Sequence, residues 1–282
     1  MYPRSFEYVA VGGIDEAVSA LAGAEFGKVM SGGMSLLPMM KLRLLSPELV
    51  VDIGGVGGLD SISDNGDHFG IGALVRHAQT ASSGALPKAL VDAASWTGDV
   101  QVRNRGTTCG AVAHCDIAAD QPAAVMALGA TMVAQGPDGP REIACEDFFV
   151  DTLTSALEPG EILTEIRIPK KGGASAYDKL GRRGGHTDYA VAGVAAWVEK
   201  SKGSVSGCRV ALTGVGTKTT LAGGVADALI GTDGSEQAVA EAAEKATEGV
   251  TVLEDLYGSE EYKSHLAQVF TRRALAQALA QL

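Results

Sequence analysis

Two glycine-containing loops carry residue types that bind phosphate groups. The first reads Met30-Ser31-Gly32-Gly33-Met34-Ser35-Leu36 and lies between a predicted strand and a predicted helix. Consecutive glycines let backbone N–H groups converge on an anion, and the following helix adds the positive end of its dipole. Ser31 and Ser35 add hydroxyl donors. The loop matches neither the G-x-G-x-x-G pattern nor the P-loop, so a tight structural turn is the alternative interpretation.

The second loop covers residues 103–111 and reads Arg-Asn-Arg-Gly-Thr-Thr-Cys-Gly-Ala. Its threonine hydroxyls and local N–H groups can bind a second phosphate or a ribityl chain, and the later Asp120 can accept hydrogen bonds from hydroxyls. His114, Cys115 and Asp116 also follow, but adjacent ligands without a second cluster do not match zinc spacing. A nucleophilic Cys–His pair lacks an orienting motif. We therefore expect His114 to be a structural residue.

The composition limits what these loops can serve. The 282 residues include 37 glycines without a G-X-Y period, close to twice the usual ~7%. The chain is 46% hydrophobic with a net charge of −11, so it can bury a core and is not expected to bind nucleic acid. We expect a soluble, cytoplasmic protein without a transmembrane segment, because no long apolar stretch occurs. Its four cysteines lack a C-x-x-C pair and cannot form an iron–sulfur framework; they are Cys109, Cys115, Cys145 and Cys208.

Hydrophobic periodicity divides the chain into three segments that must position the loops. Residues 1–55 are predicted to form a small α/β unit, and residues 56–172 a second unit. Seven glycines lie between Gly54 and Gly72, and we interpret them as turns. The Lys/Gly cluster at 170–173 is the best boundary, and residues 173–282 read as strands followed by helices, a small α+β domain.

The predicted elements follow from apolar spacing and capping residues. A loop is predicted over 101–110. Strands are predicted at 28–30, 49–53, 69–73, 165–168, 174–180, 191–198 and 205–212. Helices are predicted at 14–21, 35–45, 87–95, 122–128, from Ser235 to Ala246, and at 266–274.

Three motifs resemble one protein family in the same order along the chain, and the resemblance extends over nearly the whole chain. Residues 31–43 read SGGMSLLPMMKLR, close to the A-G-G-H-S-L-L-P-M-M-K-L-R signature of the FAD-binding medium subunit of molybdenum hydroxylases. Residues 103–120 resemble that family's R-N-R-G-T-I-G-G-N/D-x-A-H-x-D-P-x-x-D. Ala176–Leu180 with Asp188–Gly193 provides a third match. The sequence is thus similar to the carbon monoxide dehydrogenase medium-subunit and xanthine dehydrogenase FAD-subunit family.

This resemblance implies a fold and a cofactor. The fold would be α+β, with two α/β FAD-binding subdomains of the PCMH-type flavoprotein fold and a C-terminal α+β domain with a small antiparallel sheet and helices. Asp120 would bond the ribityl or pyrophosphate region of FAD. Lys179 would lie near the flavin or be a solvated surface lysine, and Tyr189 would lie against the isoalloxazine ring or be a core tyrosine. The predicted cofactor-binding residues are Met30, Ser31, Gly32, Gly33, Met34, Ser35, Leu36, Thr107, Thr108, Cys109, Gly110, Ala111, Asp120, Lys179 and Tyr189.

Departures from the family pattern include the following four positions. Met34 replaces a common histidine and removes the residue through which related flavoproteins attach FAD covalently, so FAD is expected to bind noncovalently. Cys109 stands for glycine, Ala111 for Asn or Asp, and Ile117 for proline. If Cys109 required a positive φ, its Cβ would cost roughly 1 kcal/mol. A thiol beside a flavin would also be open to oxidation.

The resemblance further implies an electron-transfer subunit without a catalytic acid or base of its own. A large partner would hold a molybdenum cofactor and a small partner [2Fe–2S] clusters, in a dimer of heterotrimers. Electrons would pass through FAD to a quinone, O2 or NAD. Carbon monoxide is one candidate substrate of the complex, beside N-heterocycles, purines, aldehydes and aromatic thioesters. The alternatives are a self-contained flavin-dependent oxidoreductase of the same superfamily and a non-catalytic nucleotide-binding or assembly protein.

Overall fold

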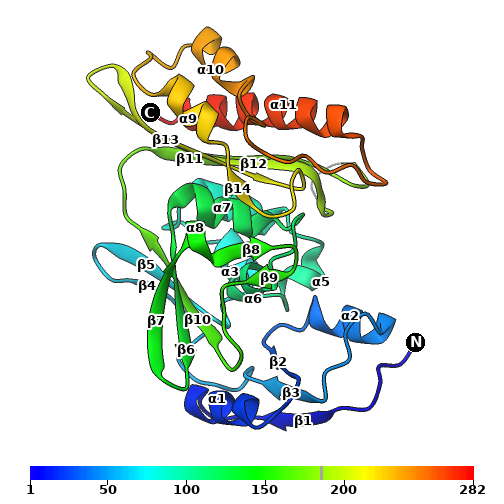
Figure 1. Ribbon diagram of the computed structural model, residues 1–282. Helices are drawn as coiled ribbons and strands as arrows, with labels where there is room; N and C mark the ends of the chain where they lie inside the picture. Colours follow the sequence, from blue (N-terminus) through cyan, green and yellow to red (C-terminus); the bar gives the residue numbers. More distant parts are fainter. Residues whose placement is uncertain (185–186) are drawn as a thin grey trace.

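Three units are stacked along the long axis of the molecule (Figure 1). The computed structural model describes residues 1–184 and 187–282. The N-terminal unit, drawn in blue, lies at one end, and the C-terminal unit, drawn in yellow to red, lies at the other. The middle unit, in cyan and green, joins them, so a site between any two units draws on distant parts of the chain.

The N-terminal unit is a parallel sheet in the order β1-β3-β2. Its strands are β1 (Glu7–Ala10), β2 (Gly27–Met30) and β3 (Leu49–Asp52). Parallel neighbours need crossover connections, which α1 (Ile14–Ala22) and α2 (Leu36–Leu42) provide. The helix predicted over 35–45 is too long: it ends at Leu42 because Arg43 has a left-handed backbone with φ 60°.

The middle unit contains an antiparallel sheet in the order β4-β5-β10-β6-β7. The loop predicted over 101–110 is wrong in part, since it holds one short helix and the start of another. Asp99 accepts a bond from the Val102 N–H at 2.9 Å and Thr107 one from the Gly110 N–H at 3.1 Å, so each starts a helix. The strands are β4 (Ile62–Asp64), β5 (His68–Gly72), β6 (Thr131–Gly136), β7 (Gly139–Ala144), β8 (Phe149–Asp151), β9 (Thr154–Ser155) and β10 (Ile162–Pro169), and the helices are α3 (His77–Ala81), α4 (Lys88–Ser95), α5 (Val100–Arg103), α6 (Thr108–His114), α7 (Asp120–Leu128) and α8 (Cys145–Phe148).

The C-terminal unit confirms the predicted antiparallel sheet with helices. Its strands run in the order β11-β12-β13-β14, and α11 lies along β11 and β12 on one face (Figure 1). It contains a helix that was not predicted, α9, which the glycines at 223 and 224 concealed. The strands are β11 (Ala174–Gly181), β12 (Ala190–Ser201), β13 (Ser204–Thr213) and β14 (Thr220–Leu221), and the helices are α9 (Gly223–Leu229), α10 (Glu236–Ala243) and α11 (Glu260–Leu279).

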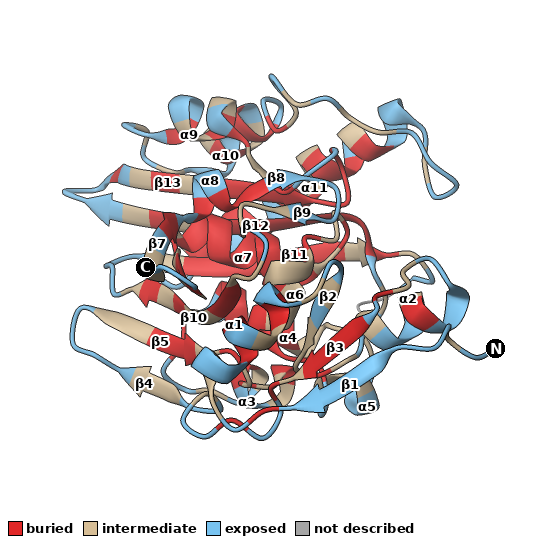
Figure 2. Ribbon diagram, turned by 60° about the horizontal axis from the view of Figure 1, so that its bottom comes forward, coloured by how far each residue is buried: buried red, intermediate tan, exposed pale blue. Residues whose placement is uncertain are grey.

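Helix α7 joins the middle and C-terminal units through a shared core. All nine of its residues are buried, and it packs against β12 and β13 as well as α4 (Figure 2). A helix that is apolar on nearly every side is stable only when it is covered all round. None of the helices in the described part of the chain is long and apolar enough to span a membrane.

Candidate cofactor site

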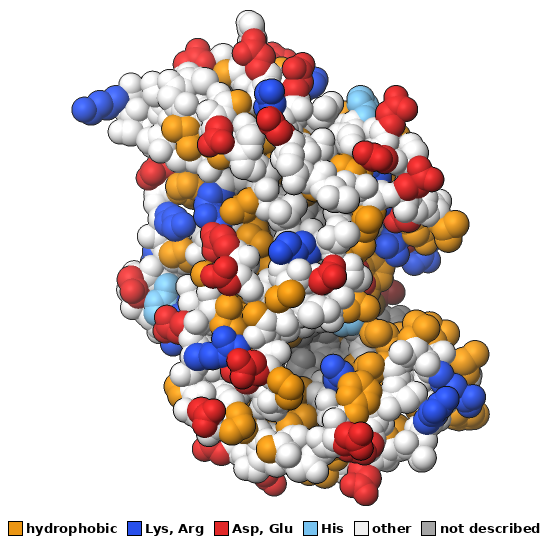
Figure 3. Space-filling view, viewed as in Figure 1, with side chains coloured by type: hydrophobic (Ala, Val, Ile, Leu, Met, Phe, Trp, Pro, Cys, Tyr) orange, Lys and Arg blue, Asp and Glu red, His pale blue; other side chains and the backbone are white. Residues whose placement is uncertain are grey.

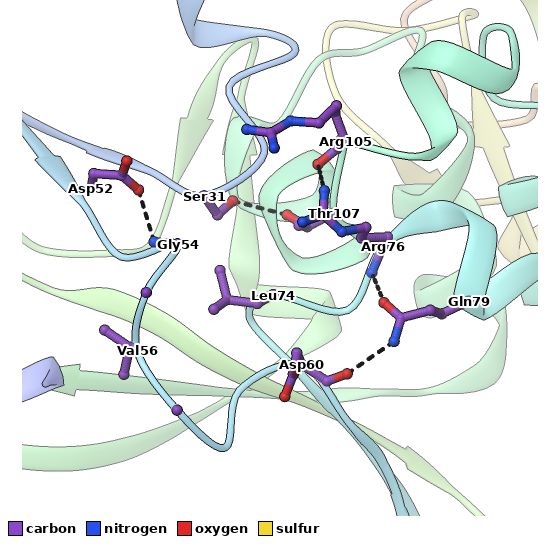
Figure 4. A pocket seen from close by; sticks show the side chains of 12 residues that line it. Ser31, Asp52, Gly54, Val56, Asp60, Leu74, Arg76, Gln79, Arg105 and Thr107 are labelled. Carbon is purple, nitrogen blue, oxygen red and sulfur yellow. Dashed lines mark hydrogen bonds between the residues drawn. The ribbon is translucent and has the colours of Figure 1, made fainter. Parts of the chain in front are cut away.

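A cavity of about 560 Å³ lies between the N-terminal and middle units. It opens at the carboxyl ends of the parallel strands β2 and β3, the position where open α/β sheets bind ligands. Figure 4 shows its walls converging from both units. The lining residues are Ser31, Asp52, Gly54, Gly55, Val56, Gly57, Asp60, Leu74, Arg76, Gln79, Arg105 and Thr107.

The two predicted loops meet at this cavity. The hydroxyls of Ser31 and Thr107 lie 2.9 Å apart (Figure 4). Gly32 is buried against the second loop: a Cβ added there would lie 2.2 Å from the Arg105 carbonyl oxygen and 2.8 Å from the Gly106 Cα. Gly33 has φ +73°, which disfavours any side chain. The glycine pair thus serves loop-to-loop contact and a left-handed turn, in addition to exposing backbone to an anion.

A third loop, which follows β3, was missed as part of the site. Gly54, Gly55 and Gly57 lie in turns, as predicted, and they also line the cavity, which was not predicted. No atom lies within 4 Å of a Cβ built on Gly57, so bare backbone faces open space there. The available signal was a glycine cluster directly after a buried parallel strand, which is a common ligand-binding position.

Two arginines give the cavity a positive wall. Arg76 and Arg105 both line it, and Arg76 Nη1 donates to the Asn104 carbonyl oxygen at 2.7 Å. Arg76 is therefore fixed by the second loop rather than by a carboxylate. On the opposite side, the Asp52 carboxylate accepts bonds from Tyr8 at 2.6 Å and from the Gly54 N–H at 2.8 Å. Cations and acceptors in one cavity suit a ligand with both phosphates and sugar hydroxyls.

Thr108 and Cys109 do not present their side chains to the cavity. The Thr108 hydroxyl bonds Thr80 at 2.7 Å, and the Cys109 thiol bonds the Ile71 carbonyl oxygen at 3.3 Å, both inside the core. Cys109 lies in α6 and has no positive φ, so its Cβ causes no backbone strain of the kind that a positive φ would bring. Burial raises the pKa of the Cys109 thiol far above its usual value, which keeps it protonated and resistant to oxidation.

Asp120 and Lys179 form a buried ion pair between the middle and C-terminal units. Lys179 Nζ lies 2.7 and 2.8 Å from the Asp120 carboxylate oxygens, and it also donates to the Asp188 carbonyl oxygen at 2.6 Å. Tyr177 donates to the same carboxylate at 2.5 Å. Burial raises the pKa of Asp120, against the opposing effect of Lys179. A solvated surface role for Lys179 is thus wrong, and a cofactor contact of either residue stays a prediction.

Tyr189 brings the C-terminal unit to the first loop. Its side chain is 41% exposed, so the alternative of a core tyrosine is wrong. Partial burial raises the pKa of its hydroxyl, and a hydrogen bond with Ser35 opposes that rise. The Arg182 guanidinium lies 5.2 Å from the Tyr189 ring centre. Tyr189 and Ser35 therefore connect residues from opposite ends of the molecule beside the cofactor loop.

The predicted residues of the two loops differ in how close they lie to the cavity. Ser31 and Thr107 line it directly. Met30, Gly32, Gly33 and Gly110 adjoin these two, and a Cβ on Gly110 would lie 3.1 Å from the Ser31 hydroxyl. Met34, Leu36 and Ala111 lie farther along the same two loops and do not line the cavity. Among the described residues no group of His, Cys, Asp and Glu side chains is arranged to hold a metal.

His77 supports the second loop from within the protein. Its backbone N–H donates to the Gly106 carbonyl oxygen at 3.0 Å, and its ring nitrogen Nδ1 accepts from the Gln121 amide at 3.1 Å. Burial lowers the pKa of His77 to about 4, with a smaller contribution from Arg103. The ring is therefore neutral near pH 7, and a proton on Nδ1 would displace the bond from the Gln121 amide.

We expect the stability of the protein to fall as the pH drops from about 6.5 to about 4 because of His77. The unfolded chain takes up this proton near pH 6.5, whereas the folded chain takes it up only near pH 4. The resulting loss in the free energy of unfolding over that pH range is roughly 3 kcal/mol. Urea unfolding of wild-type protein and His77→Gln at pH 7 and pH 4.5 measures it. Equal losses in both proteins would contradict the assignment.

Comparison with known proteins adds to this geometry. Residues 4–171 match the family described as the FAD binding domain in molybdopterin dehydrogenase, and residues 175–278 match the CO dehydrogenase flavoprotein C-terminal domain. The chain is 39% identical to the carbon monoxide dehydrogenase medium chain of Hydrogenophaga pseudoflava, covering 99% of both chains. It is 35% identical to the 6-hydroxypseudooxynicotine dehydrogenase complex subunit alpha of Paenarthrobacter nicotinovorans, over 99% of this chain and 96% of that one.

The solved structures give the same result at the level of the fold. Carbon monoxide dehydrogenase from Hydrogenophaga pseudoflava, in a form lacking the Mo-pyranopterin moiety of its cofactor, superimposes with a TM-score of 0.94. The match covers 99% of both chains at 39% identity. The architecture and the order of the motifs are therefore shared from one end of the chain to the other.

Proposed function

We propose that this chain, which belongs to the family of FAD-binding medium subunits of molybdenum hydroxylases, binds FAD in the cavity between its N-terminal and middle units and relays electrons. The observation that carries this proposal is the meeting of three glycine loops and two arginines at the carboxyl ends of β2 and β3. The relatives are named as subunits or chains of dehydrogenase complexes. We propose partners of the same kind for this chain.

The residues present fit the dinucleotide. Two phosphate charges would be bound by backbone N–H groups of the Ser31–Ser35 loop and by Arg76 and Arg105, which line the same cavity. The carboxylate of Asp52, on the wall opposite Arg76, and that of Asp60, beside Gln79, would accept bonds from sugar hydroxyls. Met34 offers no nucleophile for covalent attachment, so binding would be noncovalent.

The bound flavin would supply reversible electron uptake, and the protein's contribution is to position it and tune its surroundings. The Ser31–Thr107 contact holds the two loops together, and Tyr189 closes the site from the C-terminal unit beside Ser35. We further propose the unit boundaries near residues 55 and 172, and a dimer of heterotrimers with molybdenum and [2Fe–2S] partner chains in the cytoplasm.

Flavin binding and partner-dependent reduction test this function. The purified full chain should bind one FAD with the absorption of an oxidised flavin, and the assembled complex should reduce that flavin when its substrate is added. The chain alone should turn over none of the candidate substrates, carbon monoxide included. Substrate turnover by the isolated chain would favour the self-contained oxidoreductase. An inability to bind added FAD would favour the non-catalytic alternative.

A further inference from the structure

The helix that follows the first cofactor loop is apolar and largely uncovered. α2 reads Leu-Leu-Pro-Met-Met-Lys-Leu, and Met40 is its one buried residue. Leu37 and Leu42 are 40% and 58% exposed, and Leu44, just beyond the helix, is 71% exposed. Surface helices normally direct polar residues outward, and contiguous exposed apolar residues mark interaction sites. An apolar helix left open in this way is typical of a docking surface.

The patch extends onto the N-terminal segment. Arg43 Nε donates to the Tyr2 carbonyl oxygen at 3.4 Å, and the Tyr2 residue is 85% exposed. Figure 3 shows hydrophobic side chains gathered at the corner of the molecule where α2 and the N-terminus lie, with Lys and Arg beside them. We define the α2 patch as Tyr2, Leu37, Lys41, Leu42, Arg43 and Leu44.

The charge around the α2 patch is opposite to that of the whole molecule. The chain has a net charge of −11, yet no Asp or Glu occurs between Glu25 and Glu48. Lys41 and Arg43 give the patch a basic edge. An isologous contact of this patch with a second copy would offer these cations no carboxylate, because the patch contains none. Charge therefore favours a different protein with carboxylates around its contact area.

The position of the patch relates it to the cofactor. Leu37 follows directly after Ser35 and Leu36 of the first loop, so a partner on α2 would contact the helix that directly follows the cofactor loop. In the described part of the chain no side chains are arranged to hold a metal centre. Under the proposed function, the electrons arrive from another protein, and the α2 patch lies directly after the cofactor loop.

We propose that the α2 patch is the docking surface for the protein that delivers electrons to the cofactor, and that this partner presents an apolar area bordered by carboxylates. The inference rests on the proposed function and adds to it the place and chemistry of partner contact. Leucines at the centre supply buried apolar area, and Lys41 and Arg43 at the edge supply orientation and speed of association.

The double variant Leu42→Glu/Leu44→Glu tests the apolar part of the surface in the complex purified from the native host through a tag on this chain. Two carboxylates would face an acidic partner, and we expect the apparent Kd for the iron-containing partner to rise at least about a hundredfold, the scale of losing two central side chains. The readout is iron recovered per flavin. Ile230→Glu is the matched control, because Ile230 is 47% exposed at the far end of α9.

The charge reversal Lys41→Glu/Arg43→Glu tests the basic edge. We expect about tenfold or greater weakening at low salt and a reduced dependence of the Kd on salt, because these cations act mainly through screened attraction. As a control for folding, the isolated full-length chain carrying Leu42→Glu/Leu44→Glu should keep its FAD content and its thermal midpoint.

The outcomes separate this inference from the proposed function. Unchanged iron per flavin in the leucine variant would overturn the docking surface while leaving FAD binding intact. Loss of FAD from the isolated variant would overturn it as well, since α2 would then serve the cofactor. A change from dimer to monomer in the isolated chain would identify a second copy as the occupant and also overturn it. Failure of the wild-type chain to bind FAD would instead contradict the proposed function.

Discussion

Gly32→Ala is expected to abolish flavin retention while the C-terminal unit stays folded. The added methyl group would lie 2.2 Å from the Arg105 carbonyl oxygen and 2.8 Å from the Gly106 Cα, both backbone atoms that cannot rotate aside. The two loops must then separate, which removes the Ser31–Thr107 contact and opens the cavity wall. We expect the Kd for FAD to rise by about a hundredfold or more, the scale of a few kcal/mol of strain. Equilibrium dialysis against FAD measures it.

Gly13→Ala provides the matched control for this variant. Gly13 lies in the same unit, has no atom within 4 Å of an added Cβ and does not line the cavity. Its FAD affinity should be that of the wild type. A Gly32→Ala protein that binds FAD normally would show that the two loops separate without harm to the site.

Lys179→Met is expected to cause the largest loss of stability among single changes of the polar core. It leaves the Asp120 carboxylate buried without its cation, a change that typically costs about 3–5 kcal/mol. Removing both charges in Asp120→Leu/Lys179→Met should recover most of the loss, because a buried pair contributes little net stability over apolar residues. Lys88→Met is the surface control: its partner Asp92 lies at 2.8 Å, but Lys88 is 51% exposed, so the loss should stay under about 1 kcal/mol.

The stability deficit of Lys179→Met relative to the wild type should depend on pH. Burial already raises the pKa of Asp120, and removal of the opposing ammonium raises it further. The folded variant then binds a proton more tightly than the unfolded chain does, so its deficit should shrink as the pH falls from 7 toward 5. Urea unfolding at both pH values measures this change. A deficit that stays constant over the range would contradict this prediction, because it would mean that Asp120 stays ionised in the folded variant down to pH 5.

The sequence predicted the ordered elements well where a local pattern decided them. Apolar residues at helical spacing located α1, and alternation located β10, because each pattern records one buried face. The short helices α5 and α6 were not predicted, because Asp99 and Thr107, which start them, lie among residues that are also typical of a loop. The strands β6 and β7 were not predicted, although their pairing completes the middle sheet.

The candidate site was predicted where it depends on motifs and missed where it depends on tertiary contact. The Ser31 and Thr107 loops were both identified, and they line one cavity. The Gly54–Gly57 loop was not identified, because the parallel pairing of β2 with β3 places it beside Ser31. Arg76 was not identified either, because its contacts with Asn104 and Thr107 place it at the cavity. The ion pair between Asp120 and Lys179 could not be predicted from the sequence either, since the two residues belong to different units.

The complete burial of α7 has a consequence for how this chain folds and how it can be divided. Two family regions meet near the linker at 170–173, yet the core around α7 includes Ala195 and Ala211 from beyond it. A fragment that ends at the linker would expose one apolar side of that helix, and the remaining fragment would expose the matching side of its sheet. The two regions should therefore unfold in a single cooperative transition, and either one made alone should aggregate unless the other is supplied during synthesis.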